Sequence, residues 1–315
     1  MLNRRALGAG TLASLALAGC GGNRRKRIAV IPKATSHLFW VSVKEGAETA
    51  GQEMDVDILW NGPAVETDYS RQIQILDSMV AQRVDGIAIA ATERKALVSS
   101  VERAIDQGIP LTVFDSGLDT ERYDSYVATN NVEAGRQGAR ALADLIGGKG
   151  TVGIIMHAPG SGSTLDREKG FREVITRDFP NIKIVGEQFG MSDPARSRAA
   201  AENILTAHPD IDGLFGSSEP SSVGAALAIT SRGLKDKVSL VAFDSSEAMI
   251  GDLREGAIDA MVVQDPRKMG FEAVHTVVQK IRGEKPPKRI DLLAVVVRRA
   301  DLSKPQTQRL LNIGQ

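Results

Sequence analysis

The sequence is poor in the residues that build several kinds of site. It contains one cysteine, Cys20, in 315 residues, which excludes a disulfide framework and a zinc site made of cysteines. Its 39 Lys and Arg residues are balanced by 39 Asp and Glu residues, so it lacks the surplus of positive charge that binds nucleic-acid phosphates. The four histidines are scattered, and neither a P-loop nor a G-x-S-x-G motif is present. We therefore expect no metal, no cofactor and no nucleic-acid partner.

The sequence also lacks an apolar run long enough to span a membrane as a helix. Residues 6–18 follow Arg4 and Arg5 and form an apolar run that fits the core of a secretory signal. This run ends Leu-Ala-Gly-Cys, which resembles a bacterial lipobox and implies removal of residues 1–19 and lipidation of Cys20. Alternatives are a fortuitous apolar terminus and twin-arginine export. Residues 20–27 are typical of a flexible basic tether, so we expect a periplasmic or cell-surface protein that touches the membrane only through its lipid.

From residue 28 onward, short β-branched runs alternate with amphipathic stretches, which is typical of βαβ units around a parallel sheet. The predicted strands are 28–32, 56–60, 86–90, 111–114, 126–129, 151–156, 182–185, 213–215, 239–243, 260–264 and 292–297. The predicted helices are 38–52, 67–82, 94–107, 132–146, 164–178, 194–207, 221–232, 246–255 and 268–282. Together these elements predict an α/β fold.

The two halves of the chain repeat one pattern. A Val-Asp-Gly-Ile sequence at Asp85 is matched by Ile-Asp-Gly-Leu at Asp212, and Phe-Asp-Ser at Asp115 is matched by Phe-Asp-Ser at Asp244. The Asp-Gly motif and the Phe-Asp-Ser motif are 30 positions apart in the first half and 32 in the second. The repeat therefore has the length of a domain rather than of a solenoid unit. A chance recurrence is the alternative, but order, spacing and strand context agree. The sequence therefore predicts two similar domains.

These domains are predicted to be doubly wound parallel sheets joined by a hinge of three crossings. The first domain combines residues 28–129 with 265–290, and the second combines 130–264 with 291–315. The crossings are expected at 130–131, at 264–265 and near Leu292, where the chain passes from one repeated block to the other. We expect this protein to be a monomer.

Asp115 and Asp244 each follow a hydrophobic strand, one in each domain. Ligands of parallel α/β sheets bind beyond the carboxyl ends of the strands, so two facing domains would place both carboxylates in a shared cleft. They would serve as hydrogen-bond acceptors for hydroxyl groups or as a glycosidase pair. Capping of the following helices is the purely structural alternative.

Further candidates surround the two carboxylates. His37, Phe39 and Trp40 follow the first strand and form the most aromatic spot in a chain with only 4% aromatic residues. An aromatic face can cover the apolar face of a sugar ring, although packing on the sheet is the alternative. The remaining candidates are Ser116 after the first carboxylate, Thr129, Asn130 and Asn131 at a crossing, Arg167 in a helix, Ser218 after a strand and Gln264 at the hinge.

Several stretches together resemble the periplasmic sugar-binding proteins of ABC transporters, in particular the ribose-binding-protein-like group with the type I periplasmic fold. The resemblance covers nearly all of residues 28–300. It is carried by Phe39-Trp40-Val41-Ser42-Val43-Lys44-Glu45-Gly46-Ala47, Asn130-Asn131, Arg167-Glu168-Lys169-Gly170-Phe171, Leu205-Thr206-Ala207-His208-Pro209-Asp210 and Phe243-Asp244.

The resemblance implies a role for each candidate. Phe39 and Trp40 would stack on the sugar ring, with His37 where the group often has an Asn. Asp115 and Asp244 would accept hydrogen bonds from sugar hydroxyls, Arg167 would donate to sugar oxygens, and Gln264 would act from the hinge strand. Ser116 and Ser218 stand where ribose binders carry Arg and Asn, so the resemblance implies another pentose, a hexose or a polyol.

The resemblance also implies a function: a lipid-anchored binding protein that captures a sugar between its domains and delivers it to an ABC transporter permease. A sugar sensor for a membrane receptor is an alternative with the same site. An exported glycosidase using Asp115 and Asp244 is another, and it is opposed by the resemblance to non-enzymes. A transcriptional repressor would need an N-terminal helix-turn-helix, which is missing because the signal segment leads directly into the first strand.

Overall fold

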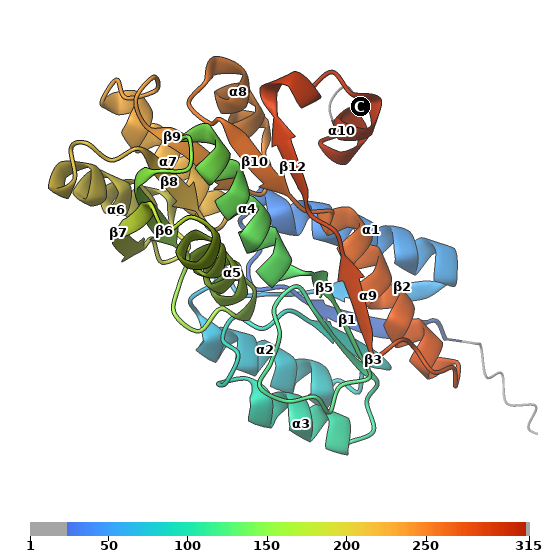
Figure 1. Ribbon diagram of the computed structural model, residues 1–315. Helices are drawn as coiled ribbons and strands as arrows, with labels where there is room; N and C mark the ends of the chain where they lie inside the picture. The colour runs from blue at the N-terminus through green and yellow to red at the C-terminus, as the bar shows by residue number, and fades with distance from the viewer. Residues whose placement is uncertain (1–23, 313–315) are drawn as a thin grey trace, which may run out of the picture.

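A computed structural model describes residues 24–312 and shows two α/β domains, each built on its own six-stranded sheet (Figure 1). The strand orders are β11-β5-β4-β3-β1-β2 and β12-β10-β9-β8-β6-β7, which are equivalent arrangements. Every neighbouring pair is parallel except β10 and β12, which are antiparallel. The predicted fold class is confirmed. No helix among residues 24–312 is long and apolar enough to cross a membrane.

The first domain has helices on both faces of its sheet. Its strands are β1 (Lys26–Ile31), β2 (Val56–Trp60), β3 (Gly86–Ile89), β4 (Leu111–Phe114), β5 (Ser125–Thr129) and β11 (Arg289–Leu292). Its helices are α1 (Leu38–Met54), α2 (Tyr69–Ala81), α3 (Val98–Asp106) and α9 (Pro266–Ile281). The apolar sides of α1 and α9 cover one face and those of α2 and α3 cover the other, which produces two buried clusters around the sheet.

The second domain repeats this three-layer arrangement. Its strands are β6 (Gly150–Met156), β7 (Ile182–Phe189), β8 (Gly213–Gly216), β9 (Ser239–Phe243), β10 (Ala260–Val263) and β12 (Val295–Arg298). Its helices are α4 (Asn131–Leu145), α5 (Gly162–Asp178), α6 (Pro194–Ala207), α7 (Glu219–Ser231) and α8 (Glu247–Glu255), followed by η1 (Arg299–Asp301) and α10 (Pro305–Leu310). Helices α4 and α5 cover one face and α6, α7 and α8 the other.

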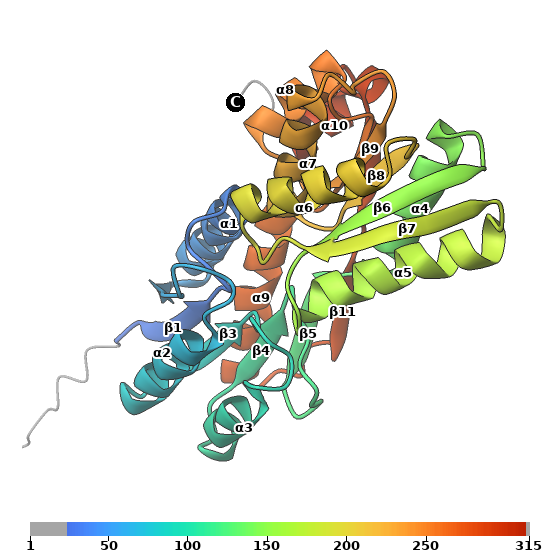
Figure 2. The same ribbon diagram turned by 90° about the vertical axis from the view of Figure 1, so that its left-hand side faces the viewer.

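The chain passes between the sheets three times, after β5, after β10 and between β11 and β12. In Figure 2 the first domain, with β1, β3 and β4, lies below the second domain, with β6, β7 and β8. The sequence predicted one final strand over 292–297. The structure instead has β11 in the first sheet and β12 in the second, with Leu293 80% exposed between them. The predicted domain boundary at 290/291 therefore falls inside β11. The short C-terminal helix α10 was not predicted.

The predicted tether is shorter than expected at its C-terminal end. Strand β1 begins at Lys26, two residues before the predicted domain start, and Lys26 pairs with Asp85 at 2.9 Å. Arg25 pairs with Asp55 at 2.9 Å. Basic residues assigned to a membrane-facing tether therefore contact acids of the first domain. Cys20 and the rest of residues 1–23 lie outside the described part of the chain.

The repeated Asp-Gly sequences perform the same structural task in both domains. Asp85 accepts a hydrogen bond from the backbone N–H of Arg27 at 2.9 Å, and Asp212 accepts one from the backbone N–H of Thr151 at 2.7 Å. Arg27 and Thr151 lie near the starts of the first strands, β1 and β6, so each carboxylate ties its following strand to the domain's first strand. The repeat in the sequence is thus a repeat in three dimensions.

Two pairs of helices approach closely through glycine. A Cβ on Gly46 would lie 1.9 Å from the Arg267 carbonyl oxygen, and one on Gly270 would lie 2.0 Å from that of Val43, which explains the close packing of α1 on α9. In the second domain, α4 and α5 meet in the same way through Gly135 and Gly170. The backbone atom that faces Gly135 is the carbonyl oxygen of Arg167, a candidate binding residue.

We predict that Gly135→Ala destabilises the protein by about 2–3 kcal/mol, because the added methyl group would lie 1.9 Å from the Arg167 carbonyl and force α4 and α5 apart. Urea unfolding measures the change. Gly251→Ala in α8 is the matched control, since a Cβ there meets nothing within 4 Å, and it should gain about 0.5–1 kcal/mol. Equal midpoints for Gly135→Ala and the wild type would contradict the packing argument.

Candidate functional site

Asp115 and Asp244 occupy equivalent, unusual backbone positions at the ends of β4 and β9. Their φ angles are 54° and 73°, in the left-handed region that few residues other than glycine adopt. Their N–H groups donate to Val127 and Val262 on the adjacent strands, both at 2.9 Å. Because such strain concentrates at functional sites, its occurrence at the same place in both domains marks the two carboxylates as components of one site.

Both carboxylates line a cavity between the domains. The cavity is narrow in this closed arrangement, with about 30 Å³ of space open to a water-sized sphere. Its lining consists of Lys33, His37, Phe39, Trp40, Glu66, Asp115, His157, Ser163, Thr164, Arg167, Ser218, Glu219, Pro220, Asp244 and Gln264. Most of these residues follow the carboxyl ends of strands, as expected for a ligand site in parallel sheets.

Arg167 is held rigidly in the second domain. Its Nε donates to Asn131 at 2.8 Å and its Nη1 to the Ser217 carbonyl at 3.1 Å. The guanidinium lies 3.8 Å from the centre of the Phe243 ring and 4.0 Å from Asp244. These contacts fix the orientation of a buried cation whose remaining donor capacity is available to oxygen atoms in the cavity.

Gln264 joins two of the three crossings. Its Oε1 accepts from the hydroxyl of Thr129 at 2.6 Å, and its Nε2 donates to Asp244 at 2.6 Å. Thr129 ends β5 and Gln264 follows β10, so the amide connects the hinge to a carboxylate of the cavity.

Eight of the residues predicted for the site line the cavity: His37, Phe39, Trp40, Asp115, Arg167, Ser218, Asp244 and Gln264. The other four lie outside its lining and have structural contacts instead. Asn130 is exposed and caps α4 by accepting from the N–H of Glu133, Asn131 holds Arg167, and Thr129 holds Gln264. Ser116 contacts Ser163 of the other domain, with 2.9 Å between the hydroxyl oxygens.

A buried charged cluster that the sequence did not predict lines the cavity. Glu66 forms an ion pair with Lys33 at 2.9 Å and hydrogen bonds with the Trp40 indole at 2.8 Å and with His157 at 2.9 Å. Lys33 and His157 follow the first strands of their domains, β1 and β6, which is a signal that could have found them. Glu66 lies in the loop after β2, where nothing in the sequence distinguishes it.

Burial and neighbouring charges set the protonation of the cluster. Burial alone would raise the pKa of Glu66, but the Lys33 ammonium and His157 outweigh it and hold that pKa well below its usual range. Burial lowers the pKa of His157, so its imidazole is neutral near pH 7. A neutral ring that donates from Nε2 to Glu66 and accepts at Nδ1 from Ser218 satisfies both contacts, each 2.9 Å long.

The cavity holds more carboxylates than cations. Burial raises the pKa of Asp115, and burial together with Asp244 raises the pKa of Glu219 to about 7. Lys33 faces Glu66, and Arg167 lies beside Asp244, so both cations already have acidic neighbours. This arrangement suits a neutral ligand with many hydroxyl groups, each of which can donate to a carboxylate.

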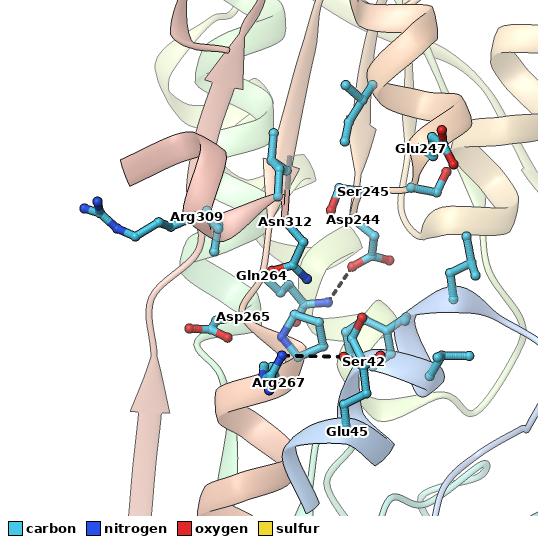
Figure 3. A pocket seen from close by; sticks show the side chains of 18 of the residues that line it. Ser42, Glu45, Asp244, Ser245, Glu247, Gln264, Asp265, Arg267, Arg309 and Asn312 are labelled. Atoms are coloured by element: carbon cyan, nitrogen blue, oxygen red, sulfur yellow. Dashed lines mark hydrogen bonds and ion pairs between the residues drawn. The ribbon is translucent and has the colours of Figure 1, made fainter. Parts of the chain in front are cut away.

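A larger groove adjoins the cavity on its outer side, between α1, the start of α8 and α10 (Figure 3). Phe39, Asp244 and Gln264 line both spaces, and Figure 3 shows Gln264 pointing toward Asp244. Arg267 and Glu45 lie 3.7 Å apart along the groove. No group of three or more His, Cys, Asp or Glu side chains within residues 24–312 is arranged to hold a metal ion.

Comparisons with known proteins agree with this architecture. Residues 28–285 match the family described as periplasmic binding protein domain. The chain is 26% identical to the ribose import binding protein of Bacillus subtilis over 270 residues, which cover 85% of this chain and 86% of that protein.

Two solved structures have higher sequence identity to this chain than the Bacillus subtilis protein has. A carbohydrate transporter solute binding protein from Agrobacterium radiobacter, in complex with D-arabinose, is 34% identical with a TM-score of 0.89, covering 91% of this chain and 99% of that one. An ABC transporter solute binding protein from Agrobacterium vitis with bound D-fucose is 31% identical with a TM-score of 0.88, covering 90% and 99%.

Proposed function

The chain belongs to the periplasmic binding protein family, and from this premise we propose that it captures one neutral pentose, hexose or polyol between its two domains. The observation that carries the proposal is the pair Asp115 and Asp244, one from each domain, on a single cavity that Arg167 also lines. The family consists of solute-binding proteins rather than enzymes and works outside the cytoplasm. Similar proteins bind D-arabinose and D-fucose, which supports a small sugar as the ligand.

The chemistry of the cavity favours a neutral sugar over a charged one. Carboxylates accept from hydroxyl groups, the Arg167 guanidinium donates to ring or hydroxyl oxygens, and the half-buried Phe39 offers an apolar ring. A sugar acid would add a negative charge beside Asp115, Asp244 and Glu219. We therefore expect uronic acids and sugar phosphates to be rejected.

Titration calorimetry tests this function directly. D-arabinose, D-fucose, D-ribose, D-allose, D-tagatose and xylitol form the panel, with D-glucuronate as the charged control. At least one neutral member should bind. At a concentration about one hundred times its Kd, it should raise the free energy of unfolding by about 2.7 kcal/mol. Absence of binding across the whole panel, with a cooperatively folded protein, would contradict the proposal.

We also propose that the chain delivers the sugar to an ABC transporter permease and acts as a monomer, without turning its ligand over. A role as a sugar sensor for a membrane receptor would use the same cavity. The glycosidase alternative requires release of a product from a glycoside. Incubation with nitrophenyl glycosides of the sugar that binds should release no nitrophenol, whereas release abolished by Asp115→Asn would favour the enzyme.

The lipid anchor is a separate part of the proposal. The order of basic residues, apolar run and Leu-Ala-Gly-Cys supports lipidation of Cys20. Because β1 begins at Lys26, only residues 21–25 lie between the lipidated cysteine and the first strand. Labelled palmitate should enter the wild type and not Cys20→Ser when both are expressed in bacteria, and equal labelling would contradict the anchor.

A further inference from the structure

The Glu66 carboxylate contacts side chains of both domains. The side chain is largely buried, at 8% exposure of the residue, and has three partners: a hydrogen bond from Trp40 on Oε1, and a hydrogen bond with His157 and an ion pair with Lys33 on Oε2. Lys33 and Trp40 belong to the first domain, as does Glu66. His157 belongs to the second domain, so the carboxylate reaches across the cleft.

The network continues on the far side. The His157 ring contacts the Ser218 hydroxyl at 2.9 Å, which in turn contacts the Ser221 hydroxyl at 3.0 Å, at the start of α7. Lys33 makes a second contact between the domains by donating to the hydroxyl of Ser161, just before α5, at 2.9 Å. One carboxylate and its partners thus join the first domain to the ends of β6, β8 and the loop before α5.

A buried charge is a poor device for stability alone. Removing charged groups from water costs several kcal/mol each, and well-packed apolar residues often stabilise a protein as well or better. This desolvation cost matters less for a contact that must break and re-form. When the domains separate, Glu66 and His157 return to water and leave neither an unpaired buried charge nor an exposed apolar patch. A polar contact is therefore suited to a reversible closure.

We propose that Glu66 is a positioning residue for closure. Together with Lys33, Trp40, His157 and Ser218 it forms a set that we term the Glu66 latch. The latch joins the domains when they close, and the Lys33 ion pair and the Trp40 hydrogen bond orient these two side chains at the cavity. Part of the free energy of closure then comes from the protein itself, so the ligand needs to supply only the remainder.

The test measures the distance between the domains without any sugar. Dyes on Gln52→Cys in α1 and Ala199→Cys in α6 report it by single-molecule energy transfer, and Cys20→Ser removes the native cysteine. Both labelled positions are exposed. We expect Glu66→Gln and His157→Asn each to raise the ratio of open to closed molecules about tenfold or more, and the double variant to add little, because the two changes break the same contact.

Glu53→Gln is the matched control, since Glu53 is an exposed glutamate of the same domain. It should leave the distance distribution unchanged. The latch is overturned if neither Glu66→Gln nor His157→Asn alters the unliganded distribution while both remain folded. It is also overturned if the effects of the two changes multiply in the double variant. Because His157 lies in the other domain, a local folding defect of the Glu66 loop cannot imitate the expected pattern.

The apparent affinity gives a second measurement, which rests on the proposed function. The apparent Kd equals the intrinsic Kd divided by the closed fraction, so it should rise by the factor by which that fraction falls. A protein that binds no sugar, but whose domains separate in Glu66→Gln, would contradict the proposed function and leave the latch intact. Sugar binding by the wild type, with unchanged domain distances in Glu66→Gln, would support the proposed function and overturn the latch.

Discussion

Asp115→Asn and Asp244→Asn should each weaken sugar binding by about 2–4 kcal/mol, or roughly 30- to 1000-fold in Kd, because each removes a buried charged acceptor from ligand hydroxyl groups. Asn keeps the shape of Asp and tolerates the left-handed backbone that both positions require. The loss should therefore appear in binding rather than in folding. Calorimetry with the sugar selected from the panel measures it.

The two variants should differ in one respect. Asp244 accepts from the Gln264 amide and from the backbone N–H of Glu219, so Asp244→Asn also disturbs contacts within the second domain. The carboxylate of Asp115 accepts only one hydrogen bond among the described residues, a long contact of 3.5 Å from Ser163. Asp115→Asn is therefore the cleaner test. Asp210→Asn, at an exposed position away from the cleft, should bind as the wild type does. A wild-type Kd in both cleft variants would place the ligand elsewhere.

Arg167→Ala should reduce affinity at least a hundredfold and should also destabilise the protein by about 2–4 kcal/mol. The guanidinium is 3% exposed, and its removal leaves Asn131 and the Ser217 carbonyl without their partner. It also leaves Asp244 with less positive charge nearby. Both losses follow from the same contacts, so they should occur together.

Arg167→Lys separates the two effects. An ammonium group keeps the charge beside Asp244 but cannot reproduce the planar set of donors that reaches Asn131, Ser217 and the ligand together. We expect this variant to fold with a smaller stability loss and still to bind at least tenfold more weakly. Urea unfolding and calorimetry on the same samples measure both quantities. Full affinity in Arg167→Lys would show that only the charge matters.

The repeat explains how much of the site the sequence could predict. Asp115 and Asp244 were found because two equal motifs follow two equal strands, and strand ends of parallel sheets are where ligands bind. Asn130 and Asn131 show the limit of this approach. Asparagine beside a helix start serves equally as a cap or as a contact, and here one caps α4 while the other supports Arg167.

The remaining differences come from tertiary contacts that no local pattern encodes. The run Leu292–Val297 is continuously apolar, so it predicts one strand, yet the chain changes sheets in its middle, with β11 at the edge of one sheet and β12 at the edge of the other. Glu66 lies in a loop without periodicity, and only the approach of His157 from the other domain gives it a function. Loop residues that act between domains are therefore the least predictable part of such a site.

The most direct test of the account is small-angle X-ray scattering of the wild type with and without saturating sugar. Three crossings allow the domains to rotate about the hinge but oppose sliding, and Asp115 and Asp244 reach one ligand only when the domains face each other. We predict that the radius of gyration falls on binding, that the change saturates at the Kd measured by calorimetry, and that it is reduced in Arg167→Lys. An unchanged radius of gyration at saturating sugar would contradict capture by closure of the two domains.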